Sequence, residues 1–215
     1  MKEINYNAFP YAGWQRWNKY FTNYPDYLTN PEACATHLAE YIPDYIDTVL
    51  QFGCGNGRDF VPFNKKLKLI GCDIAPPNYI KWIINFENLS YNRCCINDFA
   101  SLNIRDFSKI LIYTSGVMMY ETPDNQKRFF ESCLDLGCKN FIFQEYETGE
   151  YKGECLYLEE YKDFFIKKRY RDHHPNSVQP AAHILLDISD NNKKQILEKV
   201  SNRITLMNRH ILHFH

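Results

Sequence analysis

VLQFGCGNGRD, residues 49–59, joins an apolar run to three glycines that alternate with other residues. Gly53 allows a tight turn, Gly55 allows the backbone to approach a ligand closely, and Gly57 allows a helix to pack against the preceding strand. A dinucleotide-binding fingerprint would read Gly-x-Gly-x-x-Gly, but here the third glycine comes one residue early and Arg58 takes its place. The segment therefore predicts a strand, a ligand-binding glycine turn and a helix, and it disfavours pyrophosphate as the ligand.

Short apolar runs rich in β-branched residues alternate with longer amphipathic stretches from about residue 47 onward. This alternation is typical of an α/β protein in which helices cover both faces of a mostly parallel sheet. Helices are expected near Arg58, after Pro77, from Asp124 and at 191–201. We expect a seven-stranded sheet with an antiparallel edge strand, because the last two strands can pair antiparallel. The expected strands span residues 48–52, 67–73, 91–96, 109–115, 140–146, 182–188 and 204–214.

The composition limits the classes of function. With 215 residues, of which 45% are hydrophobic, the chain is long enough for one sizeable core, so a single domain over residues 1–215 is expected. A formal net charge of -1 gives no general attraction to nucleic acid. The sequence shows neither a basic segment followed by an apolar signal core nor an apolar run of about 20 residues. We therefore expect a cytoplasmic protein without a nucleic-acid or membrane partner.

Eight cysteines raise the question of a metal site or of disulfides. The sequence contains no Cys-x-x-Cys motif, since Cys94 and Cys95 are adjacent and Cys133 and Cys138 are five positions apart. Buried free thiols in a reducing compartment are the preferred interpretation, and no metal ion is expected.

A carboxylate ends the second expected strand. Asp73, in Gly71-Cys72-Asp73-Ile74, comes about 20 residues after Gly53, the spacing at which a carboxylate reaches a ribose in Rossmann-type sites. At the carboxyl end of a strand it can accept hydrogen bonds from both ribose hydroxyls. Together with the glycine turn, Asp73 is more specific than either feature alone.

This combination resembles the class I, Rossmann-like methyltransferases that depend on S-adenosylmethionine, whose first motif commonly reads as hydrophobic residues, an acid, a hydrophobic residue and Gly-x-Gly-x-Gly. The likeness covers roughly residues 47–146 and implies S-adenosyl-L-methionine as the cofactor. The chain departs from the motif at Gln51, where an acid commonly helps to receive the methionine ammonium group; glutamine keeps hydrogen bonding but lacks the charge. The resemblance implies these cofactor-binding residues: Gln51, Gly53, Cys54, Gly55, Gly57, Asp73, Ile74, Asp98, Phe99, Ser115 and Gly116.

The implied roles follow the order of the motifs. The glycine turn would shape the seat for the methionine and ribose parts, Asp73 would hold the ribose, and Ile74 would pack against adenine. Asp98 would accept from the adenine amino group with Phe99 nearby, and residues 115–116 would bring the backbone close to the transferable methyl group. Each feature taken alone also has an ordinary explanation, such as a turn, a surface carboxylate or a helix cap.

The ends of the chain are expected to complete the site. Residues 1–46 form an aromatic cap in which Tyr11 and Trp14 are candidates to enclose the sulfonium by cation–π attraction, with ordinary packing as the alternative. Residues 147–180 are expected to form an acceptor-site insertion, and residues 181–215 the C-terminal strands and helix.

Methyl transfer to oxygen usually needs removal of a proton, a task that suits histidine near neutral pH. His173 and His174, in the irregular segment Arg171-Asp172-His173-His174-Pro175-Asn176, are the leading candidates for a catalytic base. A hydrated pair in a loop is the alternative, and metal binding with Asp172 is a further one. Four residues expected at the ligand rim either orient the acceptor or are solvated: Glu121, Gln144, Glu145 and Tyr146.

The expected function is transfer of a methyl group to an oxygen or nitrogen atom of a small polar metabolite, such as a sugar, an amino-acid derivative or a secondary-metabolite precursor. Two alternatives stay open. One is a catalytically inactive methyltransferase-like binding or regulatory subunit, which Gln51 and the lack of an obvious base permit. The other is an NAD-dependent oxidoreductase, which the glycine spacing disfavours. The lack of an Asn/Asp-Pro-Pro-Tyr/Phe signature argues against methylation of nucleic-acid bases.

Overall fold

The computed structural model describes residues 38–55, 57–63, 66–74, 86–94, 96, 98–118, 121, 123–145, 167–170, 181–196 and 198. These residues form a seven-stranded sheet with the strand order β3-β2-β1-β4-β5-β7-β6. The strands are β1 (Thr48–Phe52), β2 (Lys68–Asp73), β3 (Leu89–Arg93), β4 (Ile110–Ser115), β5 (Asn140–Glu145), β6 (Lys167–Tyr170) and β7 (Ala181–Leu185).

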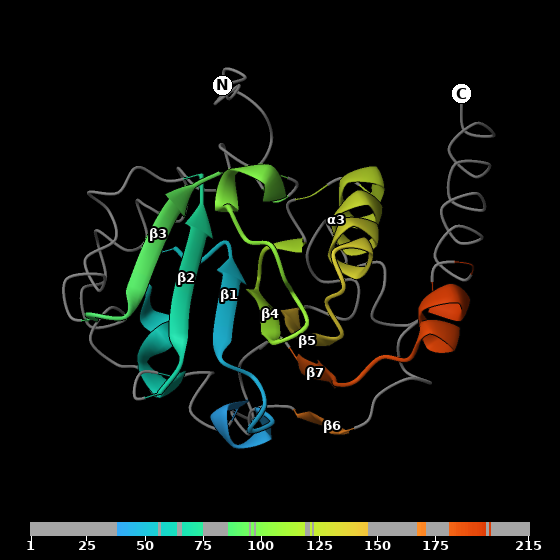
Figure 1. The fold of residues 1–215 in the computed structure, drawn as a ribbon, viewed down its shortest axis with the longest axis horizontal. Helices are drawn as coiled ribbons and strands as arrows, with labels where there is room; N and C mark the ends of the chain where they lie inside the picture. Colours follow the sequence, from blue (N-terminus) through green and yellow to red (C-terminus); the bar gives the residue numbers. More distant parts are fainter. Residues whose placement is uncertain are drawn as a thin grey trace, which may run out of the picture.

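The first five strands run parallel to one another, and β7 pairs antiparallel with both β5 and β6. In Figure 1 the arrowheads of β1, β2 and β3 therefore all point the same way, so that their carboxyl ends lie at the same end of the sheet. The expected α/β fold with a mostly parallel sheet and antiparallel pairing at one side is confirmed. Strand order reverses at β1, whose neighbours are β2 and β4. In open α/β sheets, ligands bind at such a reversal, outside the carboxyl ends of the strands.

The strand at one edge differs from the one that the sequence predicts. β6 (Lys167–Tyr170) lies within a segment expected to be irregular, and it forms through antiparallel pairing with β7, with a shift in register. Its sequence, KKRY, lacks the apolar pattern of a buried strand, and charge is a common feature of edge strands. The strand expected at 204–214 and the helix expected after Pro77 lie outside the described residues, while residues 190–196 are helical as expected.

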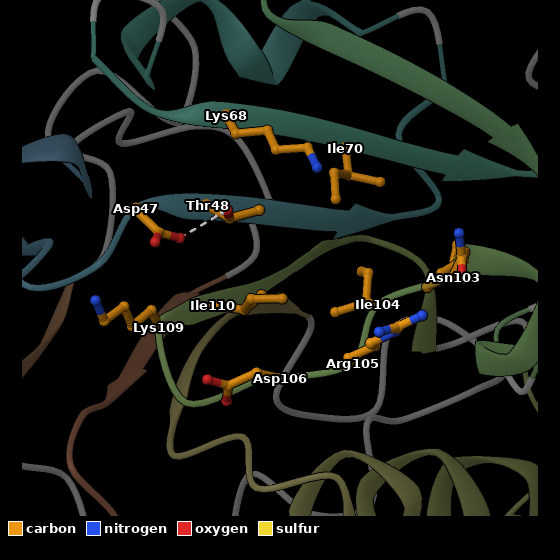
Figure 2. A pocket seen from close by; sticks show the side chains of 11 residues that line it. Asp47, Thr48, Lys68, Ile70, Asn103, Ile104, Arg105, Asp106, Lys109 and Ile110 are labelled. Atoms are coloured by element: carbon orange, nitrogen blue, oxygen red, sulfur yellow. Dashed lines mark hydrogen bonds between the residues drawn. The ribbon is translucent and has the colours of Figure 1, made fainter.

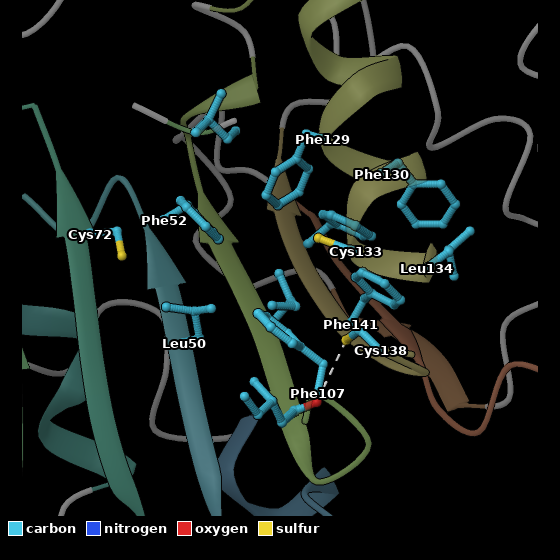
Figure 3. Close-up of a cluster of buried hydrophobic side chains, with 14 of the residues drawn as sticks. Leu50, Phe52, Cys72, Phe107, Phe129, Phe130, Cys133, Leu134, Cys138 and Phe141 are labelled. Atoms are coloured by element: carbon cyan, nitrogen blue, oxygen red, sulfur yellow. Dashed lines mark hydrogen bonds between the residues drawn. The ribbon is translucent and has the colours of Figure 1, made fainter. Parts of the chain in front are cut away.

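Hydrophobic side chains are buried on both faces of the sheet, as a parallel sheet requires. Leu50 and Phe52 of β1 point into one cluster, and Val49 points into the other. The first cluster is closed by α3 (Pro123–Asp135), which begins with proline at its first position, where the missing N–H costs nothing. Figure 3 shows four α3 side chains facing the sheet, as the apolar spacing predicts: Phe129, Phe130, Cys133 and Leu134.

The second cluster is covered by short 3-10 helices. Phe60 and Phe63 of η3 (Arg58–Phe63) pack against Val49, Leu111 and other residues of the sheet. Residues of η2 (Leu38–Tyr41) pack against the same cluster, whereas Phe99 and Leu102 of η6 (Phe99–Leu102) belong to the first cluster. Among the described residues, no helix has the length and hydropathy of a membrane-spanning segment.

The cysteines that the structure describes take part in packing. Five are free and buried: Cys54, Cys72, Cys94, Cys133 and Cys138. The interpretation of buried free thiols is confirmed for these five.

Candidate functional site

The glycine turn leaves the carboxyl end of β1 in a left-handed backbone. Gly53, Gly55 and Gly57 have φ values of 65°, 53° and 82°, a region that side-chain-bearing residues rarely adopt. The Gly57 N–H donates to the carbonyl of Cys54 at 2.8 Å and closes the turn. η3 then begins at Arg58, as the sequence predicts.

The first two glycines differ in the space that a side chain would find there. A Cβ at Gly53 would lie 2.0 Å from Cγ2 of Val117, so the side chain of Val117 fills that space. A Cβ at Gly55 would meet nothing within 4 Å among the described residues. A ligand can therefore approach the backbone at Gly55, whereas Gly53 serves the packing between two loops.

Cys54, between these glycines, points into the second core cluster and is buried. Burial is the main cause that raises the pKa of its thiol well above the usual value, and the charge of Asp73 adds to it. Its backbone N–H donates to Cys72 at the end of β2. The Cys54 thiol therefore belongs to the core, and its backbone holds the turn against β2.

Asp73 stands at the carboxyl end of β2, beside the glycine turn. Its side chain is 8% exposed, and Oδ2 accepts a hydrogen bond of 2.7 Å from the backbone N–H of Gly55. The hydroxyl of Tyr91 in β3 donates to the Asp73 carbonyl at 3.1 Å. Asp73 therefore braces the glycine turn, a role that its spacing in the sequence did not reveal.

The residues expected around adenine follow β2 and β3. Ile74 is half-buried beside Asp73. Asp98 is exposed at the N-cap of η6, where its side chain makes no capping hydrogen bond. The ring of Phe99 packs at 5.3 Å from that of Phe52 and at 5.7 Å from that of Phe129. Phe99 thus packs in the aromatic core of the protein.

The loop after β4 forms the second side of the site. Ser115 is half-buried, and Gly116 has a φ of 60° with nothing within 4 Å of a Cβ among the described residues. The N–H of Gly116 donates to the Gln144 carbonyl at 2.9 Å, which ties the loop to β5. Gly55 and Gly116 therefore both leave open space at the carboxyl ends of β1 and β4.

Glu145 is fully buried at the end of β5 and holds the same loop. Its carboxylate accepts from the backbone N–H of Val117 at 3.1 Å and from that of Met118 at 3.3 Å. Burial raises the pKa of this carboxyl to about 7, although these hydrogen bonds oppose the shift. The sequence placed Glu145 at an accessible rim, but the structure encloses it as the anchor of the β4 loop.

Two other expected rim residues also have partners within the protein. Gln144 is buried, and its Oε1 accepts from the Tyr113 hydroxyl at 2.6 Å. Glu121 is half-buried and accepts from Asn125 Nδ2 at 2.9 Å. Burial raises the pKa of Glu121. Gln144 therefore stabilises the interior, whereas Glu121 stays partly accessible.

Gln51, where the family motif commonly has an acid, is 1% exposed in β1. Its Nε2 donates to Oδ2 of Asp59 in η3 at 3.2 Å. Its Oε1 is buried and has no hydrogen-bond partner among the described residues. The sequence analysis did not single out Asp59, since a pairing between a strand and the following short helix has no local signature.

Several predicted residues lie outside the described residues: Tyr11, Trp14, Tyr146, His173 and His174. In the part of the chain that the structure does describe, no group of three or more His, Cys, Asp or Glu side chains is arranged to hold a metal ion.

A hollow of about 310 Å³ lies at the opposite end of the strands. Figure 2 shows it between the starts of β1, β2 and β4, with Asp47, Lys68 and Lys109 along its sides. The glycine turn, Asp73 and Gly116 are at the carboxyl ends of these strands. The hollow is therefore separate from the candidate site.

Comparison with known proteins identifies the fold. No protein-family model and no curated protein sequence matches the chain. Among solved structures, phosphoethanolamine N-methyltransferase 1 of Haemonchus contortus, in complex with phosphoethanolamine and S-adenosylhomocysteine, matches with a TM-score of 0.58 and 11% identity. The match covers 98% of this chain, which spans 57% of that chain.

Two further structures agree. A TehB-like SAM-dependent methyltransferase of Corynebacterium glutamicum has a TM-score of 0.57 and 14% identity, over 82% of this chain and 98% of its own. The other is the 1,6-didemethyltoxoflavin-N1-methyltransferase of Burkholderia thailandensis, with bound 1,6-didemethyltoxoflavin and S-adenosylhomocysteine. It has a TM-score of 0.50 and 14% identity, and the match covers 88% of this chain and 77% of that chain. The chain has the fold of Rossmann-like methyltransferases.

Proposed function

We propose that this chain binds S-adenosyl-L-methionine at the carboxyl ends of β1, β2 and β4 and transfers its methyl group to an oxygen or nitrogen atom of a small polar metabolite. The observation that carries the proposal is the juxtaposition of Asp73 with the open backbone at Gly55, together with the open backbone at Gly116 in the loop after the neighbouring strand β4. The fold supports it, because solved methyltransferases with bound S-adenosylhomocysteine share it.

The described residues fit the cofactor in two respects. Gly55 and Gly116 both have room for a ligand against the backbone, where a side chain would occupy the space. Asp73 lies beside the Gly55 backbone at the carboxyl end of β2, and a carboxylate there can accept hydrogen bonds from ribose hydroxyls. Ile74, Asp98 and the backbone at Ser115 remain the proposed contacts for adenine and for the methionine part.

When bound, S-adenosylmethionine supplies a methyl group on a sulfonium that makes the transfer favourable. The protein then has to align the lone pair of the acceptor behind the methyl carbon and to exclude water. The backbone N–H groups of Val117 and Met118 donate to the buried carboxylate of Glu145 and so hold the loop after β4 in place. This side of the site is thus ordered in the absence of a ligand. His173 and His174 are the proposed bases for an oxygen acceptor.

Two structural neighbours support a small-molecule acceptor. The structures from Haemonchus contortus and Burkholderia thailandensis hold phosphoethanolamine and 1,6-didemethyltoxoflavin, which are both small molecules. We extend this class to the present chain, with residues 147–180 as the acceptor-site insertion and residues 1–46 as a cap that carries Tyr11 and Trp14. The whole chain is proposed to be one cytoplasmic methyltransferase domain.

Calorimetric titration with S-adenosylmethionine, S-adenosylhomocysteine and NAD tests the proposal. We expect binding of the first two ligands, its loss in Asp73→Ala, and unchanged binding in Asp106→Ala, a control at the opposite end of the sheet. Binding followed by methylation of a small-molecule acceptor completes the proof. Binding without turnover over a broad acceptor panel would instead indicate a regulatory module, and binding of NAD alone an oxidoreductase.

A further inference from the structure

The hollow at the amino ends of β1, β2 and β4 lies outside the proposed methyltransferase site. Its volume of about 310 Å³ is at the lower end of the range that small-molecule sites occupy in proteins. Its lining residues belong to the starts of these three strands, to the end of η6 and to the segment 103–109 that joins η6 to β4. The proposed function assigns no role to this end of the sheet.

The floor of the hollow is apolar. Ile70 of β2, Ile110 of β4 and Leu102 of η6 are buried core residues that also line it, and Ile104 is half-buried there. Figure 2 shows Ile70, Ile104 and Ile110 grouped together, with the charged side chains around them. The hydrocarbon part of a ligand can therefore pack against these side chains, because removal of apolar surface from water favours binding.

Both acidic side chains of the hollow are held by local hydrogen bonds. Oδ1 of Asp47 accepts from the hydroxyl of Thr48 at 2.8 Å, and Oδ1 of Asp106 accepts from the backbone N–H of Ser108 at 2.8 Å. The hydrogen bonds from Ser108 are the main cause that lowers the pKa of Asp106, and the charge of Lys109 adds to it. The two carboxylates thus have donors within their own segments of the chain.

The basic side chains of the hollow have no such partners. Lys68, Arg105 and Lys109 are exposed, and none forms an ion pair or a side-chain hydrogen bond with the residues that the structure describes. The hollow has three positive and two negative side chains, and therefore an excess of one positive charge, although the whole chain has a formal net charge of -1. This local excess favours a small anion and is too small to attract a polyanion such as nucleic acid.

We propose that this hollow is a second ligand site, which binds a small organic phosphate with the phosphate group at the basic rim and the hydrocarbon part on the isoleucine floor. The guanidinium of Arg105 can donate two parallel hydrogen bonds to phosphate oxygens, and the ammonium groups of Lys68 and Lys109 add positive charge. The site is independent of the proposed function, since it uses the other end of the sheet.

An NMR titration of the full-length protein with three probes tests both parts of the site. Phenyl phosphate carries a ring and a phosphate group, inorganic phosphate carries the charge alone, and phenol carries the ring alone. Phenyl phosphate is expected to bind about tenfold more tightly than either other probe, because it uses the floor and the rim together. It should shift the backbone amide signals of Lys68, Arg105 and Lys109 to saturation, and leave those of Gly55 and Asp73 unchanged.

Three variants test the rim. Lys68→Gln combined with Arg105→Gln is expected to weaken the binding of phenyl phosphate about tenfold and to leave the binding of phenol unchanged. Asp106→Asn removes a negative charge but keeps an oxygen that can accept from Ser108, so it is expected to tighten the binding of phenyl phosphate about twofold to threefold. Lys194→Gln, a matched change at an exposed helical position, should have no effect. Thermal melting shows whether each variant is folded.

The other outcomes overturn the inference. Equal affinities for phenyl phosphate and inorganic phosphate would indicate general attraction of counterions, and equal affinities for phenyl phosphate and phenol would indicate an apolar hollow without a phosphate site. Shifts confined to Gly55 and Asp73 would place the phosphate at the carboxyl ends of the strands instead. The comparison of the three probes uses the wild-type protein, so poor folding of the double variant would not prevent the test.

Discussion

The side chain of Val117 fills the space directly above Gly53, where a Cβ would lie 2.0 Å from Val117 Cγ2. Gly53 begins the turn after β1, and Val117 lies in the loop after β4. Because β1 and β4 are neighbours in the sheet, this contact sets the spacing between the two loops that border the candidate site. The Val117 N–H is in turn bound by Glu145, so the position of this contact depends on β5.

Gly53→Ala is therefore expected to lower the free energy of unfolding by about 2–5 kcal/mol, from the steric clash together with the strain of an alanine at a φ of 65°. Gly137→Ala is the matched control, since Gly137 has a φ of 87° but open space around a Cβ. It should show the backbone strain alone, about 1–2 kcal/mol. Urea unfolding measures both values. Equal losses in the two variants would show that Val117 moves aside easily.

Phe129→Ala is expected to cost about 3–5 kcal/mol of stability, because it opens a cavity in the aromatic core between α3 and the sheet. The Phe129 ring lies 5.1 Å from that of Phe52 and 5.7 Å from that of Phe99. Arg128→Ala, at the exposed neighbouring position of the same helix, is expected to change stability by less than about 0.5 kcal/mol. The two free energies of unfolding, measured in urea, should differ accordingly; a small loss at Phe129 would contradict the packing described.

The buried part of the fold could be predicted from the sequence because its signal is local. The continuous apolar runs of β1, β4 and β5 predict strands that are covered on both faces, and the spacing of Phe129, Phe130 and Cys133 predicts the buried side of α3. β6 has no such signal. Its four residues pair through the backbone with β7, and such pairing leaves little trace in a sequence such as KKRY.

The candidate site likewise has residues that the sequence predicts and residues that it does not. The glycine turn and Asp73 could be found because turn geometry requires glycine, and a carboxylate at the end of the next strand has a characteristic spacing. The bracing roles of Asp59 and Glu145 could not be found, since each depends on a tertiary contact. Asp59 pairs with Gln51 across a turn, and Glu145 bonds a loop 27 and 28 positions away in the sequence.

Asp73→Ala is expected to loosen the glycine turn even in the absence of any ligand. The variant removes the acceptor of the Gly55 N–H, a bond of 2.7 Å. The amide of Gly55 should then exchange its hydrogen about tenfold faster, as expected for the loss of one charge-assisted hydrogen bond. Hydrogen exchange followed by NMR measures this rate, with Asp106→Ala as the control that leaves it unchanged. An unaltered rate in Asp73→Ala would leave Asp73 with a role in ligand binding alone.

Glu145 should make the stability depend on pH between about 4.5 and 7. Burial raises its pKa in the folded protein from the usual 4.5 to about 7, so the folded state holds a proton that the unfolded state has already lost in this window. Its favourable contribution is present below pH 4.5 and is lost as the pH rises to 7. A shift of this size corresponds to roughly 3 kcal/mol.

Glu145→Gln removes this titration while keeping an oxygen that can accept from Val117 and Met118. Relative to the wild-type protein, the variant is expected to gain roughly 3 kcal/mol of stability as the pH is raised from 4.5 to 8. The difference in the free energy of unfolding, measured in urea at half-unit steps of pH, gives this gain directly. Glu87→Gln, the same substitution at an exposed position, is measured alongside as the control for the change of residue type. If the difference between Glu145→Gln and the wild-type protein does not change with pH, the Glu145 carboxylate titrates alike in the folded and unfolded states. Its side chain would then be accessible to water and not buried beneath the loop after β4.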